Sequence, residues 1–70
     1  MLQEKLGERI RNLRQEKAGL SQEKFANKIE MDRTYYSAIE RGQHSASITT
    51  LARIADGLDV TLEEMFEGLS

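Results

Sequence analysis

Residues 19–42 read Gly-Leu-Ser-Gln-Glu-Lys-Phe-Ala-Asn-Lys-Ile-Glu-Met-Asp-Arg-Thr-Tyr-Tyr-Ser-Ala-Ile-Glu-Arg-Gly, and this stretch carries several helix start and stop signals. Ser21 and Asp32 can each cap a helix, because their side chains accept hydrogen bonds from the free amides of a first helical turn. Gly19 and Gly42 stand where chains commonly leave a helix. The inward-facing residues are Phe25, Ala26 and Ile29 of the first helix, and Tyr36 and Ile39 of the second. The stretch therefore predicts two short helices joined by a brief turn.

The sequence on both sides of this stretch is also helical in pattern. Before it, apolar residues recur at helical spacing in a helix that should end near Lys17 or Ala18. After it, Ser47 can cap a fourth helix, and residues 61–64 form a capping box that opens a fifth. The apolar stripes are Leu2, Leu6, Ile10 and Leu13, then Leu51, Ile54, Ala55 and Leu58, then Leu62, Met65 and Phe66. We expect an all-α fold, a compact five-helix bundle in which residues 1–70 form a single domain.

Composition argues against several classes of protein. The 70 residues are 39% hydrophobic and 31% charged, which is typical of a globular chain. There is no cysteine, so a disulfide framework is not expected. No apolar run exceeds two residues, which argues against a signal peptide and a membrane span. We therefore expect a cytoplasmic protein that contacts no membrane.

Catalytic and metal chemistry are not expected. His44 is the single histidine, and its sequence neighbour Ser45 does not by itself make a catalytic pair. The chain has no glycine-rich phosphate loop and no cluster of metal ligands. The acids at positions 63, 64 and 67 are explained by the capping box and a solvated helix face. We expect no enzyme activity, no cofactor, no metal and no small-molecule ligand.

Charge is distributed unevenly along the chain, whose net charge is −2. Residues 1–44 carry nine Lys and Arg against seven Asp and Glu, whereas residues 45–70 carry one arginine against five acids. Such asymmetry can mark one half for a polyanion and the other half for protein contact. In a chain this short it can also arise by chance, so charge alone leaves both readings open.

The order of motifs resembles that of the Cro/CI-type (Xre) helix-turn-helix regulators of phages and bacteria. The similarity runs from about Ile10 to Phe66. It rests on Gly19-Leu20-Ser21-Gln22, Phe25-Ala26, Ile39-Glu40-Arg41-Gly42 and Leu51-Ala52-Arg53-Ile54-Ala55. Each motif is weak alone, but the order and spacing are specific. The resemblance implies a lambda-repressor-like domain in which the N-terminal residues of the third helix enter the major groove of DNA.

A narrower resemblance links residues 32–41 to the recognition segment of restriction–modification controller proteins. Arg33 lies in the first turn of the third helix, where its guanidinium can pair with guanine O6 and N7. A phosphate contact or a solvated arginine is the alternative. Thr34 and Ser37 can bond a base or a phosphate, and Tyr35 can press on the sugar–phosphate backbone. The candidate DNA-binding residues are Gln22, Arg33, Thr34, Tyr35, Ser37, Arg41 and His44.

The family resemblance also assigns roles outside base reading. It implies that Gln22 holds a phosphate and braces the recognition helix, and that Arg14 pairs with Glu40 to tie this helix to the bundle. One extra residue lies between Arg14 and Gly19 relative to the usual spacing, which leaves the register of that pair open. His44 stands where controller-type relatives tend to carry arginine, which puts in doubt which base is read.

The C-terminal half holds more apolar residues than the core of one small subunit should need. Those in excess are Val60, Leu62, Met65, Phe66 and Leu69. Exposed together they would form a larger apolar patch than monomers usually show, so we expect a homodimer through the fourth and fifth helices. The sequence predicts a transcriptional regulator that binds a partly palindromic operator in double-stranded DNA and associates with the nucleoid. The alternative is a helical protein–protein adaptor or an antitoxin-type module that binds a partner.

Overall fold

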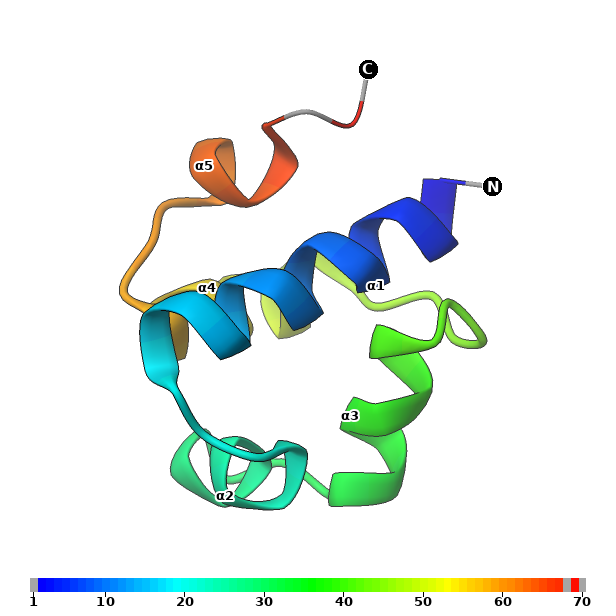
Figure 1. The fold of residues 1–70 in the computed structure, drawn as a ribbon. Helices are drawn as coiled ribbons and strands as arrows, with labels where there is room; N and C mark the ends of the chain where they lie inside the picture. The colour runs from blue at the N-terminus through cyan, green and yellow to red at the C-terminus, as the bar shows by residue number, and fades with distance from the viewer. Residues whose placement is uncertain (1, 68, 70) are drawn as a thin grey trace.

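A computed structural model of the chain describes residues 2–67 and residue 69. Its elements are α1 (Leu2–Leu13), a π-helical turn η1 (Arg14–Ala18), α2 (Gln22–Lys28), α3 (Arg33–Glu40), α4 (Ile48–Leu58) and α5 (Leu62–Phe66). In Figure 1, α1 crosses the middle of the molecule, with α2 and α3 on one side and α5 on the other. These residues contain no strand, so the predicted all-α bundle is confirmed.

The helix starts are set by the polar residues expected from the sequence. Ser21, Asp32 and Ser47 each accept a hydrogen bond from the backbone amide three residues later. Thr61 and Glu64 form the capping box that opens α5. Each cap satisfies amide groups that the first turn of a helix leaves without an internal partner. Within the described part of the chain, no helix is both long and apolar enough to cross a membrane.

The first helix changes its winding in its last turn. The Gly19 amide donates to the Arg14 carbonyl at 2.8 Å, and this wider spacing makes residues 14–18 a π-helical turn. A π-turn holds one residue more than an α-turn, so it accommodates the extra residue before Gly19. Gly19 then ends the helix in the left-handed conformation, at φ 64°, which glycine adopts without steric cost.

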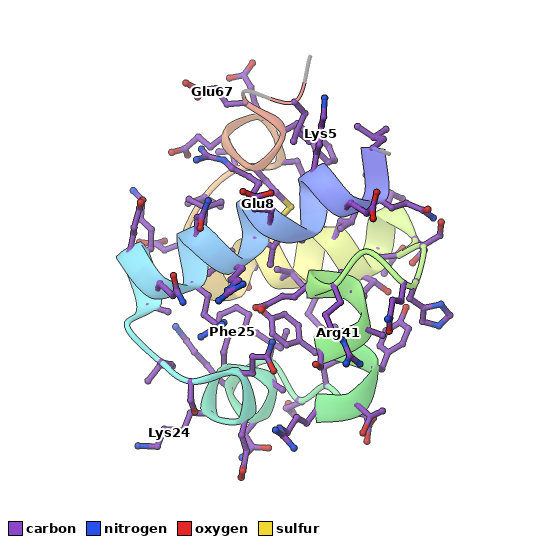
Figure 2. The ribbon with its side chains drawn as sticks, turned by 45° about the vertical axis from the view of Figure 1, so that its right-hand side comes forward. Lys5, Glu8, Lys24, Phe25, Arg41 and Glu67 are labelled. Carbon is purple, nitrogen blue, oxygen red and sulfur yellow. The ribbon has the colours of Figure 1, made fainter. Side chains whose placement is uncertain are left out.

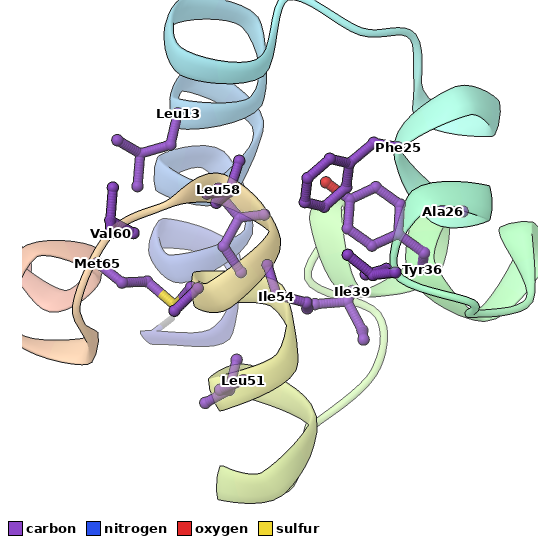
Figure 3. Close-up of a cluster of buried hydrophobic side chains, with 13 residues drawn as sticks. Leu13, Phe25, Ala26, Tyr36, Ile39, Leu51, Ile54, Leu58, Val60 and Met65 are labelled. Atoms are coloured by element: carbon purple, nitrogen blue, oxygen red, sulfur yellow. The ribbon is translucent and has the colours of Figure 1, made fainter.

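The core is apolar and draws on every α-helix, as Figure 3 shows. The rings of Phe25 and Tyr36 lie 5.3 Å apart and join α2 to α3. Leu2, at the start of the apolar stripe of the first helix, is 66% exposed, whereas Ile10 and Leu13 farther along the same stripe are buried. Helices α3 and α5 pack against α1.

Helices α1 and α3 approach each other backbone to backbone. A Cβ atom at Gly7 would lie 2.3 Å from the Glu40 carbonyl oxygen and 2.5 Å from that of Ile39. Any side chain at this position would therefore push the end of α3 away from α1. The contact sets the distance between the two helices.

Helix α5 folds back onto α1, and this corrects the estimate of excess apolar surface. Met65 is 0% exposed and Val60 is 9% exposed, so both belong to the core of their own chain. Leu62 packs partly against the same core. The estimate was wrong because the sequence pattern shows which face of a helix is apolar, but not which neighbour covers it. Phe66, at 38% exposed, and the half-buried Leu69 remain accessible.

Candidate nucleic-acid interface

Four of the predicted DNA-contact residues share one exposed surface of α3. Arg33, Thr34, Ser37 and Arg41 line a single hollow of about 230 Å³, here called the recognition hollow. Spacings of three and four residues place these side chains on one helix face. Neither arginine side chain has a hydrogen-bond or ion-pair partner among the described residues. This surface can therefore receive an external ligand.

A second and larger hollow lies between α1, α2 and α3. It measures about 510 Å³ and shares Ser37 and Arg41 with the recognition hollow, so the two hollows are adjacent. We call it the basic hollow, and its lining is Arg11, Arg14, Gln22, Ser37, Glu40 and Arg41. Figure 2 shows Arg41 on the opposite side of α1 from Lys5 and Glu67.

The Glu40 carboxylate is the centre of a buried polar cluster that borders the basic hollow. Its side chain is 1% exposed and accepts hydrogen bonds from Arg14 Nε at 2.8 Å and Nη2 at 3.2 Å. It also accepts from Gln22 Nε2 at 2.8 Å and from the Tyr36 hydroxyl. Arg14 Nη1 donates to the Leu20 carbonyl at 2.7 Å. This Glu40 cluster joins η1, α2 and α3 through charge-assisted hydrogen bonds.

The Glu40 cluster keeps its central carboxyl ionised. Burial disfavours the charged form, but the hydrogen bonds from Arg14, Tyr36 and Gln22 outweigh it and hold the pKa of Glu40 below its ordinary range. Burial, followed by the hydrogen bond to this carboxylate, raises the pKa of Tyr36, so its hydroxyl remains a donor. The charge of Arg14 is thus compensated inside the protein.

Tyr35 and His44 lie outside both hollows. The two rings meet edge to face, with centroids 5.0 Å apart and planes at 86°. His44 instead lines a separate pocket of about 190 Å³, next to Leu6 and Ile39. The structure therefore places these two predicted contact residues together, where the ring of Tyr35 on α3 meets His44 of the following loop, and outside the recognition hollow that Arg33 lines.

Arg11 lines the basic hollow and was missed by the sequence analysis, in which α1 was read only for its apolar stripe. The available signal was its spacing from Arg14, because residues three apart lie on the same side of a helix. The Arg14–Glu40 pair that the family resemblance implied is present despite the extra residue. Gln22 is directed toward Glu40, which matches the bracing role implied for it.

The structure has two short helices joined by a tight turn, and the second presents arginines and hydroxyls on its exposed face. This arrangement defines a helix-turn-helix DNA-binding protein. The helix-turn-helix family model matches residues 10–65. The chain belongs to this family and is a DNA-binding regulator.

Two similar proteins of known role are control proteins. The chain is 46% identical over 65 residues to control protein C.MunI of Mycoplasma sp, an alignment that covers 93% of this chain and 88% of the relative. It is 34% identical over 61 residues to control protein C.BamHI of Bacillus amyloliquefaciens, covering 87% and 75%. Both alignments span the recognition segment and the helices that support it.

Solved structures of restriction–modification controllers have the same fold. The controller C.AhdI from Aeromonas hydrophila matches with a TM-score of 0.84 and 40% identity over 90% of each chain. The controller C.Esp1396I, solved as a tetramer in complex with its natural 35 base-pair operator, matches with a TM-score of 0.86 and 39% identity. That match covers 99% of this chain and 90% of the controller chain. The predicted resemblance to restriction–modification controllers is confirmed.

Proposed function

We propose that this protein binds a partly palindromic operator in duplex DNA as a homodimer and regulates transcription as a restriction–modification controller. The recognition hollow carries the proposal, because Arg33, Thr34, Ser37 and Arg41 lie together there with both arginines unpaired among the described residues. The relatives support it, since one controller of the same fold was solved on its operator. Operator binding places the protein at the nucleoid in the cytoplasm, involves no catalytic step and allows autoregulation.

Each side chain of the interface has a proposed part in binding. Arg33 reads a base, because it lies in the first turn of α3 and its planar fork fits guanine O6 and N7. Thr34 and Ser37 bond a base or a phosphate, and Arg41 bonds a phosphate. Gln22 can also reach a phosphate, since its amide has two N–H donors and the structure directs one toward Glu40. The remaining predicted contacts, Tyr35 and His44, would meet the sugar–phosphate backbone beside the α3–α4 loop.

The proposed homodimer uses the apolar residues that the subunit leaves accessible. Phe66 is exposed, and Leu62 and Leu69, which lie four residues before it and three after it, are partly exposed. A two-fold contact through α4 and α5 would cover them and set the two recognition helices about 34–36 Å apart. Half-sites are then expected about 10 base pairs apart, one turn of B-DNA.

The test of DNA recognition is binding of the purified chain to duplexes selected from a random library, followed by fluorescence anisotropy at several salt concentrations. Arg33→Ala should cost about 1–3 kcal/mol at the selected operator and flatten the preference at one base pair. Arg41→Ala should weaken binding to all sequences about equally. Arg53→Ala is the matched control, because Arg53 lines a different hollow on α4 and should not contact DNA.

Two results would contradict this assignment at different levels. If Arg33→Ala weakened operator and random duplexes equally, Arg33 would not be the base reader. If the wild type showed no salt-dependent binding to any duplex, the DNA-binding proposal would fail, and the adaptor or antitoxin-type reading would be favoured.

The dimer is tested by sedimentation across a range of protein concentrations, with and without Phe66→Glu. Phe66 is accessible, so this variant should keep its fold, which circular dichroism checks, and should shift the equilibrium toward monomer. A wild type that stays monomeric at high micromolar concentration and binds one half-site as tightly as two would contradict the dimer.

A further inference from the structure

Arg11 of α1 lies beside the helix-turn-helix unit and lines the basic hollow together with Arg41 of α3. We propose that this hollow holds one backbone phosphate of the bound DNA, clamped between the Arg11 and Arg41 guanidinium groups. The inference rests on the proposed function and adds to it a contact from the first helix. It makes α1 part of the DNA-binding surface and not only a support for α3.

The charge balance of the basic hollow favours an external anion. Three arginines and one glutamate line it. Arg14 and Glu40 compensate each other through hydrogen bonds of 2.8 and 3.2 Å. Arg11 and Arg41 are left, and neither side chain has a hydrogen-bond or ion-pair partner among the described residues. Two uncompensated cations beside one concave surface attract an anion to the space between them.

The position of the hollow identifies the anion as a phosphate of the same DNA. The basic hollow shares Ser37 and Arg41 with the recognition hollow. A duplex whose base edges reach Arg33 must carry its backbone past these shared residues, because phosphates border the groove that the helix enters. The oxygens of one phosphate can accept from both arginines and from the second amide N–H of Gln22.

The two arginines are carried by helices whose separation is already fixed. The close approach of Gly7 to the carbonyls of Ile39 and Glu40 holds α1 against the end of α3. The Glu40 cluster then ties η1 to α3 through Arg14, three residues after Arg11. Because the helices do not need to move, binding a phosphate between Arg11 and Arg41 orders only the side chains.

The first experiment measures the salt dependence of operator affinity for Arg11→Gln and Lys5→Gln. Both variants remove one positive charge from α1, but Lys5 lines a hollow with Glu67 and Leu69 on the other side of the helix (Figure 2). Arg11→Gln should lower the slope of log affinity against log salt by about 0.9 per subunit, whereas Lys5→Gln should leave it unchanged. The advantage of the wild type over Arg11→Gln should therefore shrink about 3.5-fold per subunit, or about twelvefold for a bound dimer, between roughly 50 and 200 mM salt. Arg11→Lys keeps the charge and should keep the slope.

The second experiment locates the phosphate by replacing single backbone phosphates of each half-site with uncharged methylphosphonates. One position should weaken the wild type and Lys5→Gln more than it weakens Arg11→Gln, because that variant has already lost one of the two arginine contacts to this phosphate. The proposal is overturned if Arg11→Gln has the same salt slope as Lys5→Gln, or if no position depends on Arg11. A wild type that binds no duplex would instead contradict the proposed function itself. Thermal unfolding checks that the variants fold, as expected for exposed side chains.

Discussion

The α1–α2–α3 side of the molecule and the α4–α5 side are held together by different kinds of contact. On the first side the Glu40 cluster adds directional hydrogen bonds between η1, α2 and α3. On the second side the buried contacts of α4 and α5 are apolar, with Leu58, Val60 and Met65 packed in one cluster. Apolar burial depends on area and has little direction, whereas hydrogen bonds to an ionised group require a particular distance and angle. The directional contacts occur where the helix that carries Arg33 must be held in place.

The same two sides differ in what their surfaces offer. Around α3, Arg11, Arg33 and Arg41 are without partners among the described residues. Residues 45–70 carry five acids and only one arginine, and this excess of negative charge would repel DNA phosphates. A single small core thus supports one face suited to a polyanion and one suited to a second protein chain.

The largest expected effect is on the apolar side, at Met65, which is 0% exposed. Met65→Ala should cost about 2–5 kcal/mol, the usual range for removing a buried side chain. Met65→Glu should cost more, because its carboxylate would be buried without donors. Small domains have a total stability of about 5–15 kcal/mol, so a urea titration should show Met65→Glu largely unfolded. If it were as stable as Phe66→Glu, the placement of α5 against α1 would be wrong.

The next effect concerns the α1–α2–α3 side, and it is tested by a double-mutant cycle between Arg14 and Glu40. Removing either partner leaves a buried charge without compensation and should cost about 3–5 kcal/mol in denaturant unfolding. Replacing both by methionine should restore most of the stability, because an apolar pair needs no compensation.

Measuring the DNA affinity of the same variants distinguishes the effect of the Glu40 cluster on stability from its effect on the position of α3. The double methionine variant should fold yet bind the operator more weakly than the wild type, because it has lost the contacts that orient α3. Purely additive stability effects, or full operator affinity in the folded double variant, would show that the cluster does not position the recognition helix.

The smallest effect is the dependence of stability on pH, again from the Glu40 cluster. The pKa of Glu40 is lower in the folded state than its ordinary 4.5. Its contribution to folding stability is therefore present above pH 4.5 and is lost as the pH falls through the pKa of the folded state. The pKa of Tyr36 is raised above its ordinary 10.0, so stability should also fall as pH rises past 10.0, where only the unfolded tyrosine ionises. Tyr36→Phe should remove this loss of stability at alkaline pH, and it should lower the free energy of unfolding by about 0.5–1.5 kcal/mol at neutral pH. Unfolding curves across pH that are unchanged by this substitution would contradict the assigned hydrogen bond.

The helix boundaries and most of the core could be predicted from the sequence. Ser21, Asp32, Ser47 and Thr61 were expected as caps and act as caps, because capping depends on atoms only two or three residues away. The apolar residues expected to face inward include Ile10, Phe25, Tyr36 and Ile54, and all four are buried. Helical spacing alone places each of them on the apolar face of its own helix. The helix-turn-helix and the exposed position of Arg33 followed from the same local rules.

The features that could be predicted are therefore local: where each helix begins and ends, which face is apolar, and which side chains start the recognition helix. How those faces meet became clear from the packing of the folded chain. This packing buried Met65 of α5 and the preceding Val60 in the core, left Leu2 exposed, and brought Arg11 and Arg41 from distant parts of the chain to line one hollow. It also formed the Arg14–Glu40 pair across an extra residue by widening one turn. The physical reason is that helical periodicity and capping act over a few residues, whereas burial and ion pairing depend on neighbours that only the packed chain provides.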